Sequence, residues 1–144
     1  MTPAAQGLCR SDGKRSDGLT LVPWQSGKSL VWDVTVVCPL ADSHVASAAR
    51  EARSVAELAA TKKEDINKYS GLAADYLFQP IAVETLGPIN ESASDFFLTS
   101  GQQISHHSGD ERETAFLFQR VSVLVQRFNG VLLHDSFVFE DCPE

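Results

Sequence analysis

The chain has 144 residues, 43% of them hydrophobic and 22% charged, which is close to the average of globular proteins. That length is enough to bury a hydrophobic core without disulfides or a structural metal, and one domain is the default expectation. The formal net charge of −7 argues against binding nucleic acid through a broad basic surface, because that mode needs many Lys and Arg contacts to phosphate.

The sequence predicts an intracellular protein, nuclear or cytoplasmic, that does not enter a membrane. Its longest apolar stretch, Ser29 to Leu40, is interrupted by charge and is too short to cross a bilayer. The N-terminus lacks the apolar core of a signal peptide. Cys9, Cys38 and Cys142 are widely spaced and form no CxxC pair, so reduced thiols are expected rather than a disulfide framework or a zinc site.

A β-hairpin is predicted near the N-terminus. Residues 1–16 are rich in Gly, Pro, Ser and basic side chains, a composition that predicts a flexible tail. Two runs of β-branched and apolar residues follow, Gly18 to Trp24 and Ser29 to Cys38. The loop Gln25-Ser26-Gly27 between them is typical of a hairpin turn.

The length of the hairpin loop decides which side chains share a face. With a three-residue loop, Asp17 pairs with Thr35 and Leu19 pairs with Asp33. Since opposed residues share a face and the side-chain period is two, Asp17, Asp33 and Thr35 then project from the same side. A two-residue loop would separate Asp17 from the other two.

A long helix is predicted after the hairpin, capped by Asp42 or Ser43. Apolar residues, mostly alanines, repeat at helical spacing from position 45, and the helix is expected to continue to Tyr69 and to end at Gly71. The many small side chains predict close packing of this helix against the sheet.

A returning strand and two further helices complete the predicted elements. The strand covers Tyr76 to Thr85, and the order strand, helix, strand implies a right-handed crossover. The next helix begins at Asn90 or Ser92 and ends at Ser108-Gly109. Asp110 then forms a capping-box-like start with Glu113, and a core helix carries apolar residues at helical spacing from Thr114 to Leu133.

The predicted fold class is therefore α/β, with a β-hairpin followed by a long helix, a returning strand and two C-terminal helices. The predicted organisation is a flexible tail over residues 1–16, a single domain over residues 17–139 and an acidic tail over residues 140–144.

Asp33 is the unusual residue, because it lies in an apolar strand where burying an unpaired carboxylate is costly. The structural interpretation is that it accepts hydrogen bonds from Thr35 or a neighbouring loop. The functional interpretation is that Asp17 and Asp33 together bind Mg²⁺ or Mn²⁺, hard cations that prefer carboxylate oxygens and activate water for phosphodiester hydrolysis. Lys63 or Lys68 on the predicted helix could stabilise the negative charge that develops on phosphate.

Other chemistry has little support in the sequence. Glu84, just after the Ile81–Val83 core of the returning strand, is either a third acid of this site or a solvated strand-end glutamate. The chain contains no GxSxG elbow, no GxxxxGK[ST] loop and no GxGxxG after a strand, so serine hydrolase, P-loop and dinucleotide-binding interpretations have no motif behind them.

The same residues carry a resemblance to a known family. Lys14–Gly18 (KRSDG), Val31–Val37 (VWDVTVV) and Lys68-Tyr69 resemble the restriction-like endonuclease domain that follows reverse transcriptase in some non-LTR retrotransposons, a domain of the PD-(D/E)XK superfamily. Longer segments are similar to C-terminal regions of reverse-transcriptase-like proteins in invertebrate genomes, and the likeness spans most of the chain. These segments are residues 12–24, 78–87 and 116–120.

The resemblance implies a truncated restriction-endonuclease-like core that cuts DNA by metal-dependent hydrolysis. Asp17 would be the aspartate of the PD element, Asp33 the second acid, and Lys68 a lysine that has moved onto the helix. Two positions depart from the motif. Ser16 stands where a proline precedes the aspartate, and Thr35 stands where the lysine usually follows the second acid.

Two functions therefore follow from the sequence. The first is a divergent retroelement-derived endonuclease-like domain, with DNA as its substrate and a reverse transcriptase domain of a parent polyprotein as its partner. The second is a catalytically inactive fragment that acts as an interaction or scaffold domain, docking its apolar helices onto a larger protein or a second copy in a homodimer. An exposed apolar face on the Thr114 to Leu133 helix is expected for the second function.

Overall fold

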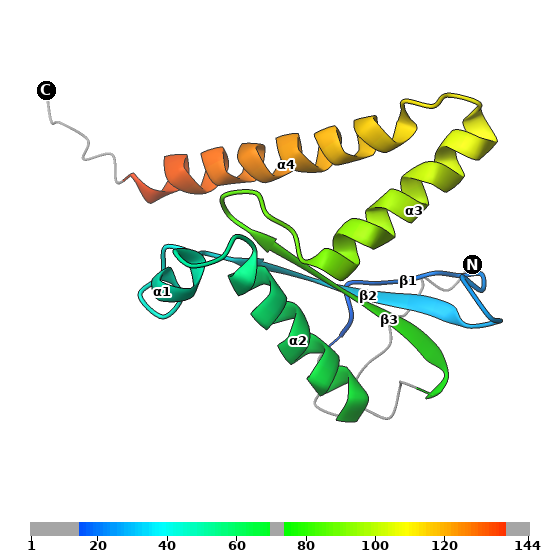
Figure 1. Ribbon diagram of the computed structural model, residues 1–144, viewed down its shortest axis with the longest axis horizontal. Helices are drawn as coiled ribbons and strands as arrows, with labels where there is room; N and C mark the ends of the chain where they lie inside the picture. The colour runs from blue at the N-terminus through cyan, green and yellow to red at the C-terminus, as the bar shows by residue number, and fades with distance from the viewer. Residues whose placement is uncertain (1–14, 70–73, 138–144) are drawn as a thin grey trace, which may run out of the picture. The chain divides into compact units, whose positions relative to one another are not determined.

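The structure is a computed structural model that describes residues 15–69 and 74–137. The predicted tails, apart from Arg15 and Ser16, and the predicted helix end at Gly71 lie outside these residues, as do Cys9 and Cys142. The elements in chain order are β1 (Gly18–Leu19), β2 (Ser29–Val37), α1 (Val45–Ala48), α2 (Ser54–Tyr69), β3 (Tyr76–Glu84), α3 (Glu91–Ser108) and α4 (Glu113–Ser136) (Figure 1). The predicted α/β class is confirmed. The chain divides into two compact units, unit 1 (Met1–Phe96) and unit 2 (Phe97–Glu144).

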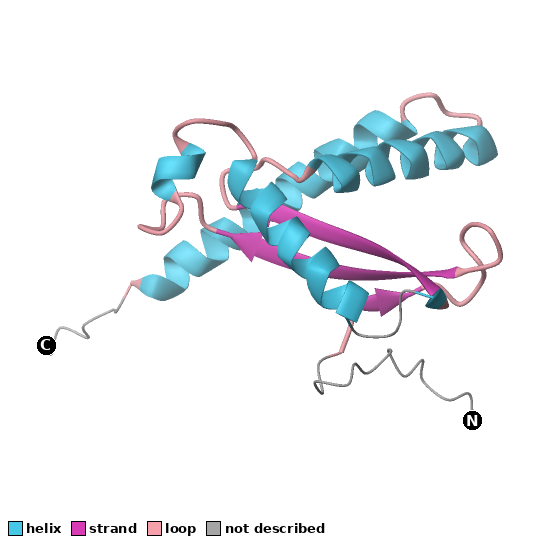
Figure 2. Cartoon of the chain, turned by 60° about the horizontal axis from the view of Figure 1, so that its bottom comes forward, coloured by secondary structure: helices cyan, strands magenta, loops and turns pink. Residues whose placement is uncertain are grey.

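The described strands of unit 1 form one mixed sheet in the order β1-β2-β3. β1 is antiparallel to β2, and β2 is parallel to β3 over its whole length, from Ser29 opposite Tyr76 to Val37 opposite Glu84. Parallel neighbours need a crossover connection, and α2 supplies it. Figure 2 shows α2 lying across the sheet.

The register of the hairpin differs from the prediction. Gly18 lies opposite Trp32 and Leu19 opposite Val31, so the predicted pairs of Asp17 with Thr35 and of Leu19 with Asp33 are wrong. The Trp32 ring explains part of this register, because it fills the space beside Gly18. A Cβ added to Gly18 would lie 2.0 Å from the nearest atom of that ring, so only glycine fits opposite Trp32.

The turn itself explains the shift. It holds two residues, Ser26 and Gly27, both with positive φ (52° and 73°), between Gln25 and Lys28. Five residues, 20–24, therefore face only two residues of β2. Pro23 in this segment has no N–H to donate to a ladder, and Leu21 and Val22 are largely exposed. The segment bulges out and ends β1 early.

The predicted single helix from position 45 to Tyr69 is also wrong, because the chain breaks between α1 and α2. Arg53, directly before α2, has φ 61°, a left-handed conformation that a continuous right-handed helix excludes. Alanine-rich sequence shows strong helical spacing on both sides of such a break, so the pattern alone does not reveal it.

The core of unit 1 lies between α2 and the sheet. It centres on Ala56, Ala60 and Ala82, with Val55 beside them only 1% exposed. Small side chains let the helix axis approach the sheet closely, as the sequence predicted. The start of α3 contributes Ala93, which is fully buried.

Asn90 joins β3 to α3 and is fully buried. Its Oδ1 accepts a hydrogen bond from the Ala82 N–H at 2.8 Å, and its Nδ2 donates to Pro80 O at 3.4 Å and to Ser92 Oγ at 2.9 Å. Every polar atom of this buried amide is therefore satisfied, which is the condition for keeping it inside the core.

We predict that Asn90→Ala lowers the free energy of unfolding by about 1–3 kcal/mol, because it leaves the Ala82 N–H and the Pro80 carbonyl without this partner. Urea denaturation checks the value. Gln103→Ala, an exposed change on α3, is the control and should stay within about 0.5 kcal/mol. Equal effects of the two changes would refute the structural role of Asn90.

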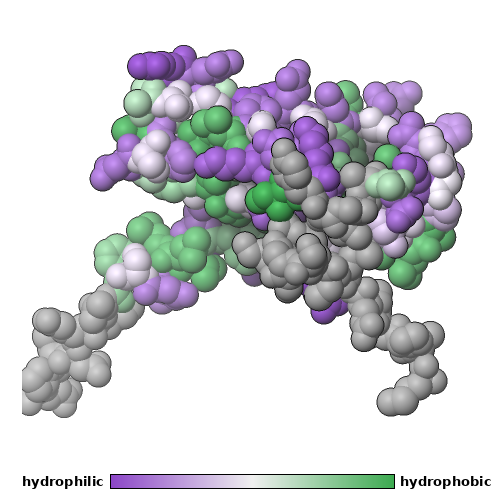
Figure 3. Space-filling view, turned by 90° about the horizontal axis from the view of Figure 1, so that it is seen from below, coloured by the Kyte–Doolittle hydropathy of each residue, from purple (hydrophilic) through white to green (hydrophobic). Residues whose placement is uncertain are grey.

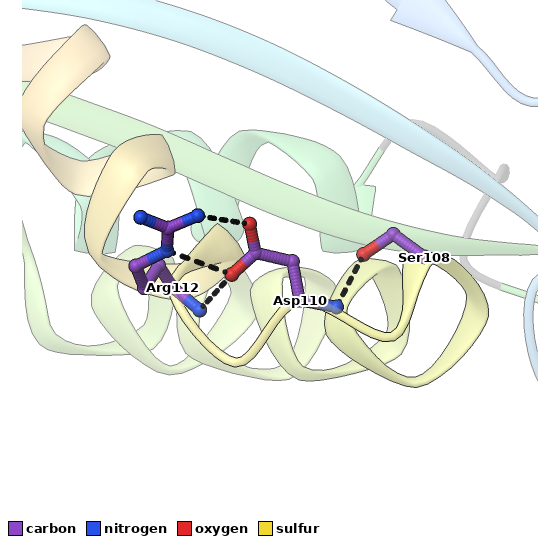
Figure 4. Close-up of polar contacts among 3 residues, drawn as sticks. All are labelled: Ser108, Asp110 and Arg112. Atoms are coloured by element: carbon purple, nitrogen blue, oxygen red, sulfur yellow. Dashed lines mark hydrogen bonds and ion pairs between the residues drawn. The ribbon is translucent and has the colours of Figure 1, made fainter.

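Unit 2 holds the rest of α3 and α4, joined by a tight turn. Gly109 in the turn has φ 77°, and Gly101 lies so close to the α4 residue Thr114 that an added Cβ would be 2.8 Å from its Cα. Asp110 accepts hydrogen bonds from the N–H of Arg112 at 2.9 Å and from its guanidinium at 2.9 and 3.0 Å (Figure 4). The side chain of Asp110, which was predicted to start this helix together with Glu113, thus binds Arg112. The N–H of Glu113 donates to the carbonyl oxygen of Asp110 at 3.4 Å.

The Asp110–Arg112 contact predicts a measurable titration. The side-chain and backbone hydrogen bonds from Arg112 hold the pKa of Asp110 below its ordinary value. A carboxyl whose pKa is lowered by folding stabilises the fold above its unfolded pKa, and that contribution is lost as the pH falls through the folded pKa. We expect carboxyl NMR titration to give a depressed pKa for Asp110 that rises in Arg112→Ala. An unchanged pKa in the variant would contradict the contact.

Candidate functional site

The central feature of unit 1 is a partly buried ion pair between β2 and α2. Asp33 is 8% exposed, and its Oδ2 lies 2.7 Å from Nζ of Lys63 on α2. The Asp33 side chain retains 11% of its exposure and that of Lys63 30%, so solvent still reaches the pair. A carboxylate in this position needs a charged partner to offset its desolvation, and Lys63 provides it.

Asp17 is held next to this pair along β2. Its N–H donates to Trp32 O at 3.2 Å, and its Oδ2 accepts the N–H of Val34 at 2.6 Å. β1 begins only at Gly18, and the Asp17 carboxylate binds the Val34 N–H just before that strand starts. Asp17 and Asp33 therefore come together at the end of β1, although through a register that the sequence did not predict.

Of the two candidate lysines, the structure brings only Lys63 to Asp33. Lys68, which the resemblance put in the site, is exposed and lies 3.6 Å from Asp65 on the same helix. Helical spacing could have distinguished them, since Ala56, Ala60 and Lys63 follow one another at i, i+4 and i+7 and share the face that packs on the sheet. Lys68 falls outside that stripe.

The remaining acid, Glu84, has a different role from either of those predicted. It is 4% exposed rather than solvated, and its Oε1 accepts the N–H of Ala56 at 3.2 Å. Ala56 lies in the first turn of α2, where backbone N–H groups lack helical partners and the helix dipole favours negative charge. Glu84 therefore anchors the start of α2 to β3 and is not a member of the Asp17–Asp33 group.

Thr35 occupies the position of the usual lysine, on the α2 side of β2. Its Oγ1 is buried and makes no hydrogen bond to the described part of the chain. Thr35 therefore does not donate to Asp33, which excludes one of the structural interpretations of that carboxylate. The ammonium group of Lys63, from the neighbouring helix, is the donor instead.

The donor set can be compared with the needs of a metal ion. Within residues 15–69 and 74–137, no three His, Cys, Asp or Glu side chains form a group that could hold a metal. Asp17 and Asp33 each use one carboxylate oxygen in the contacts above, which leaves Oδ1 of each. Mg²⁺ is often bound through one or two carboxylates while it keeps several waters, so two acids are enough in number for such an ion.

Comparison with protein-family models, with curated proteins and with solved structures finds no match to this chain. None of the described helices has the length and apolar character needed to span a membrane.

We predict that Lys63→Ala lowers the free energy of unfolding by about 1–3 kcal/mol, because it leaves the buried Asp33 carboxylate unpaired. Partial exposure of Lys63 keeps the loss below that of a fully buried pair. Lys68→Ala, which removes an exposed contact on the same helix, should change stability by less than about 0.5 kcal/mol.

Urea denaturation of both variants measures the difference. A cycle of Asp33→Asn, Lys63→Met and the double variant Asp33→Asn/Lys63→Met tests the coupling. Removal of both charges should cost less than the sum of the single changes, since neither partner is left buried alone. Strict additivity would mean that the two side chains do not interact in solution.

Proposed function

We propose that unit 1 is a divergent restriction-endonuclease-like core that hydrolyses DNA phosphodiester bonds with a bound Mg²⁺ or Mn²⁺. In this proposal Asp17 and Asp33 hold the metal, and Lys63 replaces Lys68 as the lysine of the site. The parent protein would be of the retroelement type, with a reverse transcriptase domain as its partner.

The observation that carries the proposal is the partly buried Asp33–Lys63 pair, with Asp17 bound to the backbone beside Asp33. An isolated acid in an apolar strand lowers the stability of the fold, because its carboxylate loses hydration. A chain that did not need the acid would be more stable with an apolar residue there. Here the acid is kept, a lysine from α2 is directed at it, and a second acid lies at the adjoining end of β1.

The arrangement of the elements also supports the proposal. An antiparallel hairpin, a crossover helix and a strand parallel to the second hairpin strand are the elements expected of such a core, and both acids belong to the hairpin. The lysine position two residues after Asp33 holds Thr35, and Lys63 supplies an ammonium group to the same carboxylate from the helix.

Each residue has a defined part in the proposed reaction. A bound Mg²⁺ or Mn²⁺ would supply a Lewis acid and activate water. Asp17 and Asp33 bind it through carboxylate oxygens, and the Val34 N–H fixes the orientation of Asp17. Lys63 fixes Asp33 and presents positive charge at a solvent-accessible point, where it can stabilise charge that develops on a phosphate oxygen.

The second candidate function, an interaction or scaffold domain without activity, is favoured by α4. No residue of this helix is buried. Its exposed large apolar side chains are Phe116, Val123, Leu124, Phe128, Val131, Leu132 and Leu133. The end of α4 next to the grey C-terminal residues is largely hydrophobic in Figure 3. Such a surface is typical of helices that dock onto another protein.

The test is cleavage of plasmid and single-stranded DNA by the purified full chain with Mg²⁺, Mn²⁺ or EDTA. We expect metal-dependent cutting that falls about 100-fold or more in Asp33→Asn and in Lys63→Ala, because each change removes a group from the proposed centre. Lys68→Ala separates the two lysine assignments and should cut far better than Lys63→Ala.

Asp65→Asn is the matched control for Asp33→Asn, since Asp65 is an exposed acid of α2 that forms an ion pair with Lys68. Circular dichroism establishes that each variant is folded. A folded wild-type chain that cuts neither substrate with either metal would overturn the nuclease proposal and favour the scaffold function.

A further inference from the structure

A pocket of about 320 Å³ lies between α2, the end of β2 and α1 in unit 1. Its lining residues are Thr35, Val37, His44, Val55, Leu58, Ala59, Lys62, Lys63 and Ile66. We propose that this pocket binds a small organic anion with an apolar body, such as a medium-chain carboxylate. The proposal does not depend on nuclease activity.

The pocket wall is suited to an apolar body. Five of its side chains are aliphatic and come from β2 and from successive turns of α2. Val55 at its base is 1% exposed, whereas Leu58 and Ile66 are 49% and 43% exposed at helical spacing on α2. Covering this half-exposed apolar surface removes it from water, which is the favourable term in binding an alkyl or aryl group.

The charge around the pocket selects an anion. The lining includes Lys62, Lys63 and His44 and contains no acidic residue, in a chain whose net charge is −7. A second pocket on unit 1, of similar size, has an acidic balance, because its lining contains three glutamates and one basic residue, Glu51, Glu57, Glu91 and Arg53. The contrast shows that the basic lining is local and does not reflect the general composition of the surface.

Lys62 is the residue expected to bind the anionic group. Lys63 already pairs with Asp33 at 2.7 Å, so much of its charge is compensated. Lys62 is exposed, and no ion pair or hydrogen bond of its side chain to the described residues is seen. It stands between Leu58 and Ile66 on α2, at i+4 from the first and i−4 from the second, so its ammonium group is next to the apolar wall.

The test uses two probes with the same number of carbon atoms and opposite charge, sodium octanoate and octylammonium chloride. Each is titrated into the labelled full chain, and backbone amide shifts are followed by NMR. Octanoate should give saturable shifts at Val37, Val55 and Ile66, and Lys62→Glu should weaken its binding about tenfold. Octylammonium should bind the same residues more weakly, although the net charge of the protein favours it.

Lys68→Glu is the matched control, because it makes the same charge change on the same helix outside the pocket, and it should weaken octanoate binding less than about twofold. Lys62→Met keeps the aliphatic stem and should fall between the wild type and Lys62→Glu. The proposal is overturned if octanoate gives no saturable shift at these residues, if octylammonium binds there as tightly, or if the two charge reversals have equal effects.

Discussion

Two parallel strands cannot be joined by a tight turn, so the chain between Val37 and Tyr76 must cross the sheet to start β3. That requirement places α2 over the sheet and gives its small side chains, Ala56 and Ala60, a surface to bury against. It also brings residues of α2 to the two positions where β2 and β3 carry acids. The core, the ion pair and the pocket all depend on this one connection.

The two buried acids of the sheet are satisfied by the same helix in different ways. Glu84 accepts a backbone N–H from the first turn of α2, and Asp33 accepts the ammonium group of Lys63. These contacts lie seven residues, about 10 Å, apart along the helix. Because both acids are held at once, a rotation or shift of α2 would leave at least one carboxylate buried without a partner. The polar pairs therefore fix the helix more specifically than the alanine contacts could.

The sequence allowed prediction of the α/β class, of the strand and helix order and of α3, because these have strong periodicity and clear caps. The break at Arg53 could not be predicted, since alanine repeats continue across it and a non-glycine residue with positive φ has no sequence signal. The hairpin register depended on a three-residue bulge near Pro23. Among the candidate acids, Asp33 stood out for its apolar strand and Asp17 for the predicted hairpin register. Lys63 and Lys68 differ in their place on α2, since only Lys63 follows the buried alanines at helical spacing.

The hydrogen bonding along the outer edge of β3 affects whether copies of this chain associate through their sheets. Among the described strands β3 lies at an edge of the sheet, where unpaired backbone groups invite strands from other molecules. Pro80 offers no N–H there, Asn90 binds the Ala82 N–H, and the Glu84 N–H donates to Pro88 O. The short segment between β3 and α3 thus occupies the outward N–H groups in the C-terminal half of β3. Because these groups are already bonded, addition of a strand from another copy is hindered at this half of the edge.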